Sequence, residues 1–137
     1  MSTKRFVLAT LAGGIVLFMV GGLIYGVLTA SFFEANQGSA VGVMRNPPDY
    51  VHLFLGQLVY GALLTVIIGK WAGVSGAAPA LRIGAATGLL FGFGVDLTLF
   101  GVTNVANITA TLVDPFLMAM QFALGGAVVG AVLEKVR

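Results

Sequence analysis

Asp96 is the side chain best placed to do chemistry in this chain, because it is the only acidic residue deep within a long apolar stretch. An ionised carboxylate in hydrocarbon costs about 2.5–3.5 kcal/mol. Asp96 must therefore face a neighbouring helix, a wet cavity or a partner. An ionisable group at such a position can hold a small solute or pass on a proton, so Asp96 is the centre of the candidate site.

Other polar side chains are expected at about the same depth as Asp96. A helix rises 1.5 Å per residue, which places Asp96 in the outer third of a hydrocarbon core about 30 Å thick. The same arithmetic gives similar depths to polar residues in the three other apolar stretches. The candidate ligand-binding layer consists of Asp96, Gln57, Gln121, Tyr25, Tyr60, Thr98, Asn104 and His52.

Two interpretations of this layer are open. In the structural one, Asp96 is protonated or hydrogen-bonded to Gln57 or Gln121 and ties the helices together. In the functional one, the layer lines a cavity open to the outside that binds a small solute or relays a proton. Either way, we expect the Asp96 side chain to point into the bundle and to meet Gln57, Gln121 or Tyr25.

The sequence gives little support to other kinds of chemistry. There is no cysteine, which excludes disulfides, thiol catalysis and Cys-based metal sites. His52 is the only histidine and has no spaced partner for a metal. The serines lack the base and acid that a catalytic triad needs. We therefore expect no enzyme activity, no cofactor and, because no basic run exists, no nucleic-acid partner.

The composition indicates a chain whose natural solvent is lipid. Hydrophobic residues make up 58% and charged residues 9%, whereas a soluble domain carries about 25% charged residues. Each of four apolar stretches is close to the 20 residues that a membrane helix needs. We predict an all-α membrane four-helix bundle that forms a single domain over residues 1–137, with spans at about 6–30, 51–71, 80–102 and 115–136.

Charges and flanking residues predict how the spans begin and which way they run. Asp114 and Pro115 have the residue types of an N-cap and a first helical position, so the last span is expected to begin there. The first apolar run is too long for the hydrophobic region of a signal peptide and is expected to be retained.

Basic residues stay in the cytoplasm during insertion. Six of seven fall on one side, which predicts a multi-pass protein of the cell inner membrane with both termini cytoplasmic; the six are Lys4, Arg5, Lys70, Arg82, Lys135 and Arg137.

Glycines at spacings of four predict close helix packing, because small residues let membrane helices approach. Three such seams occur: Gly84, Gly88 and Gly92 in the third span, Gly22 and Gly26 in the first, and Gly126 and Gly130 in the fourth. Each seam can pack within the bundle or against a second copy of the chain.

The segment from Asp96 to Asn104, followed by Asp114, resembles bacterial four-span inner-membrane families of unknown function. Those families carry a similar Asp-Leu-Thr-Asn element in the third span and an Asp before the fourth. The resemblance covers about the C-terminal half of the chain and implies a four-span fold with no known reaction.

The sequence favours two functions. The leading one is a small membrane binding or transport protein for a small solute or a proton, centred on Asp96. The alternative is a structural or accessory subunit that packs on a second copy or a larger membrane complex through a glycine seam. A cavity beside Asp96 would favour the first function, and a Gly-rich face open to lipid would favour the second.

Overall fold

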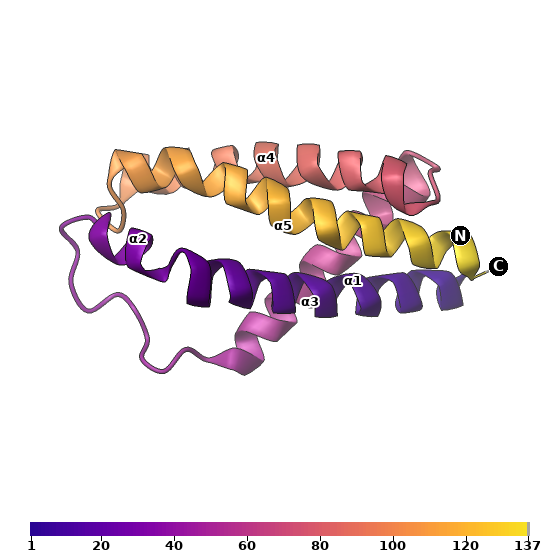
Figure 1. The fold of residues 1–137 in the computed structure, drawn as a ribbon, viewed down its shortest axis with the longest axis horizontal. Coiled ribbons are helices and arrows are strands. Elements are labelled where there is room, and N and C mark those ends of the chain that lie inside the picture. The colour runs from indigo at the N-terminus through magenta and orange to yellow at the C-terminus, as the bar shows by residue number, and fades with distance from the viewer. Residues whose placement is uncertain (137) are drawn as a thin grey trace.

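Four long apolar helices form the bundle in the computed structural model, which describes residues 1–136 (Figure 1). This confirms the predicted all-α membrane fold and the four spans, and no strand forms within the described residues. A short helix, α2 (Ala30–Ala35), follows the first span. The long helices are α1 (Thr3–Leu23) with the π-helical turn η1 (Ile24–Leu28), α3 (Tyr50–Thr65) with the π-helical turn η2 (Val66–Trp71), α4 (Ala77–Val102) and α5 (Ile108–Lys135).

Side-chain caps fix where three of these helices begin. The side chain of Ser2 accepts a hydrogen bond from the Arg5 amide at 3.3 Å, and Asp49 accepts one from the His52 amide at 3.2 Å. Each cap satisfies an amide that has no partner within the helix. Between their ends the helices satisfy their own backbone groups, as lipid requires.

The start of α5 differs from the one that the sequence predicted. Asn107, and not Asp114, is the N-cap, and its side chain accepts from the Ala110 amide at 2.9 Å. Asn is as good an N-cap as Asp, and the apolar residues after Asn107 extend the helix by two turns. Pro115 therefore lies inside α5 and is fully buried. The consequence is that Asp114 lies within the span, so Asp96 is not the only intramembrane acid.

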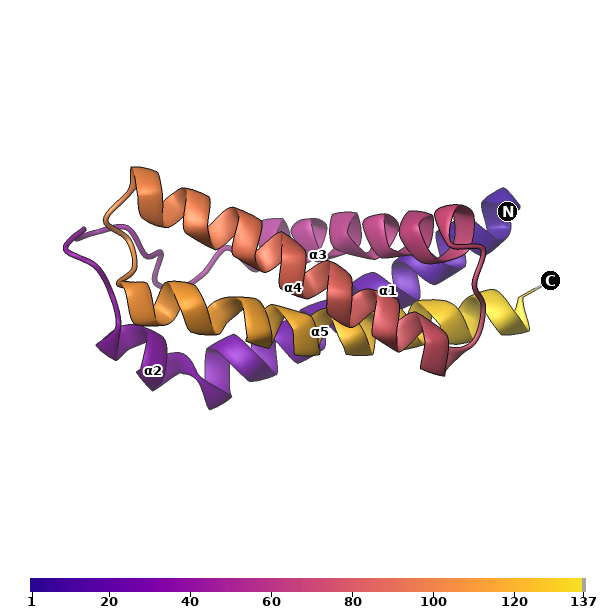
Figure 2. The same cartoon turned by 90° about the horizontal axis from the view of Figure 1, so that it is seen from above.

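The bundle has two distinct ends (Figures 1 and 2). Both α1 and α4 begin, and both η2 and α5 end, at what we call the basic end, which holds Lys4, Arg5, Lys70, Arg82 and Lys135. The sixth basic residue assigned to this side, Arg137, lies outside the described residues. The opposite or far end holds α2 and the loops over residues 36–49 and 103–107.

Helix α5 is the centre of the bundle, because it packs on α4 most extensively and also contacts α1 and α3. It supplies the largest set of buried residues. The hydrophobic core combines these with residues from every other span and consists of Ala9, Leu17, Leu64, Ile68, Ala80, Phe122, Val129 and Leu133.

Glycines bring α4 and α5 close together. A Cβ atom added to Gly92 would lie 2.8 Å from Pro115 Cα, and one added to Gly126 would lie 2.7 Å from the Ala80 carbonyl oxygen. Real Cβ atoms do not approach that closely, so only glycine fits. The third- and fourth-span glycines thus lie against each other. By contrast, no atom lies within 4 Å of a Cβ added to Gly22 or Gly26, so this seam is not used within the described chain.

Backbone pairing at the far end ties α2 to the connection between α4 and α5. The Asn107 amide donates to the Asn36 carbonyl at 3.1 Å, and the Asn107 side chain donates to Asn36 Oδ1 at 3.0 Å. The amides of Gly38 and Ala40 donate to carbonyls of the 103–107 loop at 3.0 Å. These contacts hold the segment after α2 against the far end of the α4–α5 pair.

Candidate functional site

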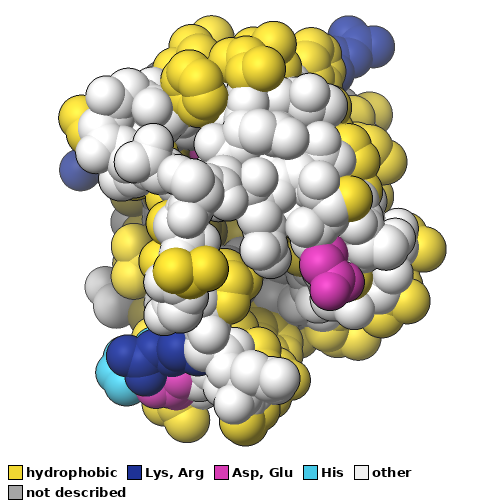
Figure 3. All heavy atoms as spheres, turned by 90° about the vertical axis from the view of Figure 1, so that its left-hand side faces the viewer, with side chains coloured by type: hydrophobic (Ala, Val, Ile, Leu, Met, Phe, Trp, Pro, Cys, Tyr) yellow, Lys and Arg dark blue, Asp and Glu magenta, His cyan; other side chains and the backbone are white. Residues whose placement is uncertain are grey.

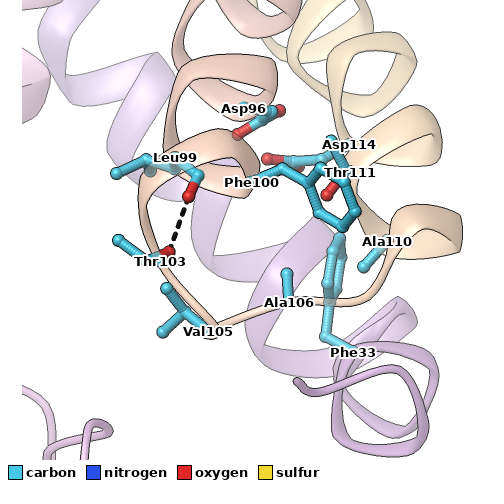
Figure 4. Close-up of a pocket in the computed structure, with 10 residues that line it drawn as sticks. All are labelled: Phe33, Asp96, Leu99, Phe100, Thr103, Val105, Ala106, Ala110, Thr111 and Asp114. Carbon is cyan, nitrogen blue, oxygen red and sulfur yellow. Dashed lines mark hydrogen bonds between the residues drawn. The ribbon is translucent and has the colours of Figure 1, made fainter. Parts of the chain in front are cut away.

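Two carboxyl groups from different helices face each other near the far end (Figure 4). Asp96 lies six residues before the end of α4, and Asp114 lies six residues after the start of α5. Because the helices are antiparallel and rise 1.5 Å per residue, both carboxyls lie about 9 Å inside the helix ends. The position of the helix start thus determines that the two acids meet.

A cavity of about 190 Å³ opens beside this carboxyl pair, between the end of α4, the loop that joins it to α5, the start of α5, and α2 (Figure 4). The volume corresponds to roughly six water molecules in the liquid. Its walls are mostly apolar, and among residues 1–136 no Lys, Arg or His lines it. The lining residues are Phe33, Asp96, Leu99, Phe100, Thr103, Val105, Ala106, Ala110, Thr111 and Asp114.

The two acids differ in their hydrogen-bond partners. The Tyr25 hydroxyl donates to Asp114 Oδ1 at 2.6 Å. Tyr25 belongs to the π-helical turn η1, and such turns often occur at functional sites. By contrast, Asp96 Oδ2 is buried and has no hydrogen-bond partner among the described residues. A buried polar atom without a partner is costly, so the pair is suited to receive a proton or a cation.

Gln57 and Gln121 form a separate network and do not hydrogen-bond to Asp96. Gln121 is buried, and its Nε2 donates to the Leu17 carbonyl at 2.9 Å and to Gln57 Oε1 at 3.0 Å. Tyr25 bonds to Asp114 instead. The expected hydrogen bond between Asp96 and Gln57 or Gln121 is therefore wrong, whereas Tyr25 reaches the carboxyl pair through Asp114. The depths agreed, but depth does not determine the direction around the helix in which a side chain points.

The Gln57–Gln121 pair predicts a measurable structural effect. Replacing Gln121 with Leu should lower the free energy of unfolding in detergent by about 1 kcal/mol, the typical strength of a hydrogen bond between membrane helices. Replacing both glutamines with Leu should cost less than the sum of the two single changes, because each single change leaves a polar group unpaired. Strict additivity in a denaturant titration would show that the two side chains do not interact.

The remaining predicted site residues lie outside the cavity. The Tyr60 ring packs against Phe91 and Phe122, with centroids 5.5 and 5.2 Å away. The Thr98 hydroxyl donates to the carbonyl of Gly94 in its own helix at 2.7 Å and is exposed. Neither residue lines the cavity.

Two further predicted site residues lie at the surface of the far end. His52 is exposed, and its Nδ1 lies 2.7 Å from Asp49 Oδ2. Figure 3 views the far end, and there the single histidine lies at the edge of the molecule beside an acidic and a basic side chain. The Asn104 side chain is exposed, and its backbone carbonyl accepts from Ala40. Neither residue contributes to the carboxyl pair.

Sequence reasoning missed Asp114 and the aromatic wall of the cavity, which includes Phe33 and Phe100. One signal in the sequence pointed to Asp114. Asn107 is a strong N-cap residue followed by an apolar run, so it offered an earlier helix start. No periodic pattern pointed to Phe33, because it lies beyond the first span, in a segment held back over the bundle by loop hydrogen bonds.

The fold and these polar groups define a multi-pass helical membrane protein with a carboxyl pair inside its bundle. Comparisons with protein-family models, with curated proteins and with solved structures find no match to this chain. What the protein does must therefore be inferred from its own geometry.

Proposed function

We propose that the chain binds a small organic cation at the Asp96–Asp114 pair, in exchange for a proton, as part of a membrane binding or transport function. The observation that carries this proposal is the facing pair of carboxyls on the wall of a mostly apolar cavity. One of their buried oxygens, Asp96 Oδ2, has no hydrogen-bond partner within the described chain.

Charge favours a cation over an anion or a neutral solute. Two facing carboxyls cannot both be ionised in apolar surroundings without a compensating positive charge. The described residues that line the cavity supply no such positive charge. A bound ammonium group compensates the pair when both are ionised, and a proton compensates it when one is not. The protein therefore has the chemistry to exchange one for the other.

The walls indicate what the rest of the solute resembles. Phe33 and Phe100 are aromatic, and their neighbours Leu99 and Val105 are aliphatic. An apolar body would be buried among them, while the ring faces could attract the positive charge. A primary ammonium on a small ring matches this combination better than a hydrated metal ion, which requires more oxygen ligands.

The test uses benzylammonium as the probe and benzyl alcohol as its neutral control. Binding to the purified protein in detergent is followed by titration calorimetry. We expect the amine to bind and the alcohol to bind at least about tenfold more weakly, because only the amine carries the charge. Equal binding of the two probes would contradict a carboxyl-centred cation site.

The binding of benzylammonium should weaken as the pH is lowered from about 8 to about 5, because protons then compete for the carboxyl pair while the amine stays charged. Tyr25, from η1, is a titratable group in contact with the pair, since its hydroxyl donates to Asp114. It is a neutral phenol over this range, so the change in binding reports on the pair. Affinity independent of pH would show that no proton is exchanged.

The orientation of the bundle decides which compartment this cavity faces. The basic end holds five of the described basic residues, which supports a cytoplasmic location for it and for both termini. The carboxyl cavity would then open outwards.

Because the chain has no cysteine, single cysteines at Ser2 and Ser39 can be labelled cleanly, and both positions are exposed. We expect an impermeant maleimide applied to intact cells to label Ser39→Cys and not Ser2→Cys. Labelling of Ser2→Cys alone would reverse the topology.

A second candidate function, that of a subunit in a larger assembly, is supported by the unused glycines of the first span. Gly22 and Gly26 lie on an exposed face of this span, with open space around them. Such glycines allow another membrane helix to approach. Replacing Gly22 with Leu should then lower the mass of the detergent-solubilised particle without unfolding the chain. An unchanged mass for this variant would count against the subunit function.

A further inference from the structure

A second cavity, of about 290 Å³, lies at the basic end, and the carboxyl site does not use it. Its walls come from the start of α1, from η2 and the loop after it, and from the end of α5. They are formed by Met1, Arg5, Gly69, Gly73, Val74, Ser75 and Leu133. This cavity contains a basic side chain and a hydroxyl, whereas the far-end cavity contains two acids.

One contact holds the Arg5 side chain at this cavity. Its Nη2 donates to the backbone carbonyl of Leu133 in the last turn of α5. Carbonyls in a last helical turn lack partners, and arginine is well suited to cap them. A guanidinium has five N–H donors, so this contact positions the group and leaves most of its donors unused. Arg5 Nε is buried and has no partner among the described residues.

Arg5 forms no ion pair within the described chain. Of residues 1–136, only Asp49 and His52 form an ion pair. Among the sequence neighbours of cavity residues, Lys4 and Lys70 add positive charge, and Glu134, whose carboxylate lies beside the loop at Gly76, adds one negative charge. Gly73 and Ser75 lie in the loop between η2 and α4, and their amides form no backbone hydrogen bond within residues 1–136. An anion bound beside a partly buried cation that has unused donors offsets the cost of burying its charge.

We propose that this cavity binds a phosphate group, that of an anionic lipid at the surface of the membrane. The guanidinium of Arg5 would hold the phosphate oxygens in a planar, two-pronged contact. The Ser75 hydroxyl would donate to the same group. A lipid is the source we favour, because Arg5 lies in the first turn of a membrane span, at the depth where headgroups lie, and basic pockets between helices bind such headgroups.

The experiment compares lipid binding by variants in native mass spectrometry. Full-length protein is reconstituted in vesicles of equal parts phosphatidylcholine and phosphatidylglycerol, then released in mild detergent. The test variants are Arg5→Gln and Ser75→Asp, which puts a carboxylate beside the guanidinium at an exposed position. Their matched controls are Arg82→Gln, an exposed arginine at the same end, and Ser75→Asn, which is uncharged.

We expect the wild type and both controls to retain one phosphatidylglycerol molecule, and the test variants to bind it about fivefold to tenfold more weakly. Phosphatidylcholine should not replace it. If Arg5→Gln does not fold, the comparison of Ser75→Asp with Ser75→Asn decides alone. Equal lipid retention by wild type and Ser75→Asp would overturn the proposal.

A second arm separates a lipid from a soluble source of phosphate. Inorganic phosphate is added to the lipid-free protein, and the melting temperature is measured. Stabilisation by phosphatidylglycerol, but not by inorganic phosphate, would support a headgroup site. Stabilisation by inorganic phosphate that Ser75→Asp removes would support the phosphate site and reject the lipid as its source.

Discussion

Replacing Asp96 with Asn should abolish benzylammonium binding while leaving the bundle folded. Asn has nearly the same shape as Asp and keeps an oxygen acceptor, but it removes one of the two charges that face the cavity (Figure 4). Removing one partner of a buried charge pair costs about 2–5 kcal/mol, which corresponds to about thirtyfold or more in affinity. Titration calorimetry on the purified variant measures the loss.

Asp114→Asn should give a loss of similar size, because the two carboxyls act as one site. The matched control is Glu34→Gln, which removes an exposed acid at the same end of the bundle but outside the cavity. This control should bind the probe as the wild type does. If all three variants lost affinity equally, the effect would come from the net charge of the far end and not from the carboxyl pair.

Replacing Gly88 with Leu should destabilise the protein more than any other single change considered for this chain. A Cβ added to Gly88 would collide with the backbone carbonyl of Met118 and would lie 2.7 Å from Phe122 Cβ. Backbone atoms cannot move aside without separating α4 from α5. Overpacking typically costs about 1–3 kcal/mol, and we expect the upper end of this range, since the new atoms meet α5 itself.

The matched control for Gly88→Leu is Gly94→Leu, on the same helix. No atom lies within 4 Å of a Cβ added to Gly94, so this leucine would face open space. Both changes replace Gly with Leu and raise helix propensity equally. The Gly88 variant should therefore melt at a lower temperature in detergent, and the Gly94 variant should not. Similar melting temperatures would mean that α4 does not pack through Gly88.

The spans were predictable from the sequence because lipid imposes a single strong constraint. An apolar stretch of some 20 residues must form a helix, since its backbone finds no other partner in hydrocarbon. The helix ends were less predictable. Asp114-Pro115 and Asn107 are both good start signals, and choosing between them required knowing that Pro115 would be buried against the glycine seam of α4.

The membership of the candidate site was predictable only in part. Depth along a span placed Asp96 correctly near the far end, but it grouped the acid with Gln57 and Gln121. Those two side chains hydrogen-bond to each other instead, because residues at the same depth can point in different directions around their helix axes. Apolar residues are spread almost evenly around all four helices. The sequence pattern therefore did not indicate which side of each helix faces the bundle, as expected where lipid and protein interior are equally apolar.

The most direct measurement of the central claim is carbodiimide labelling of the intact protein, mapped by mass spectrometry. A carbodiimide reacts with a protonated carboxyl in apolar surroundings, which is the state that the facing pair should hold when no cation is bound. We predict modification at Asp96 or Asp114, with benzylammonium protecting it and benzyl alcohol failing to do so. Modification of neither residue, or modification that benzylammonium leaves unchanged, would contradict a cation–proton exchange site in this bundle.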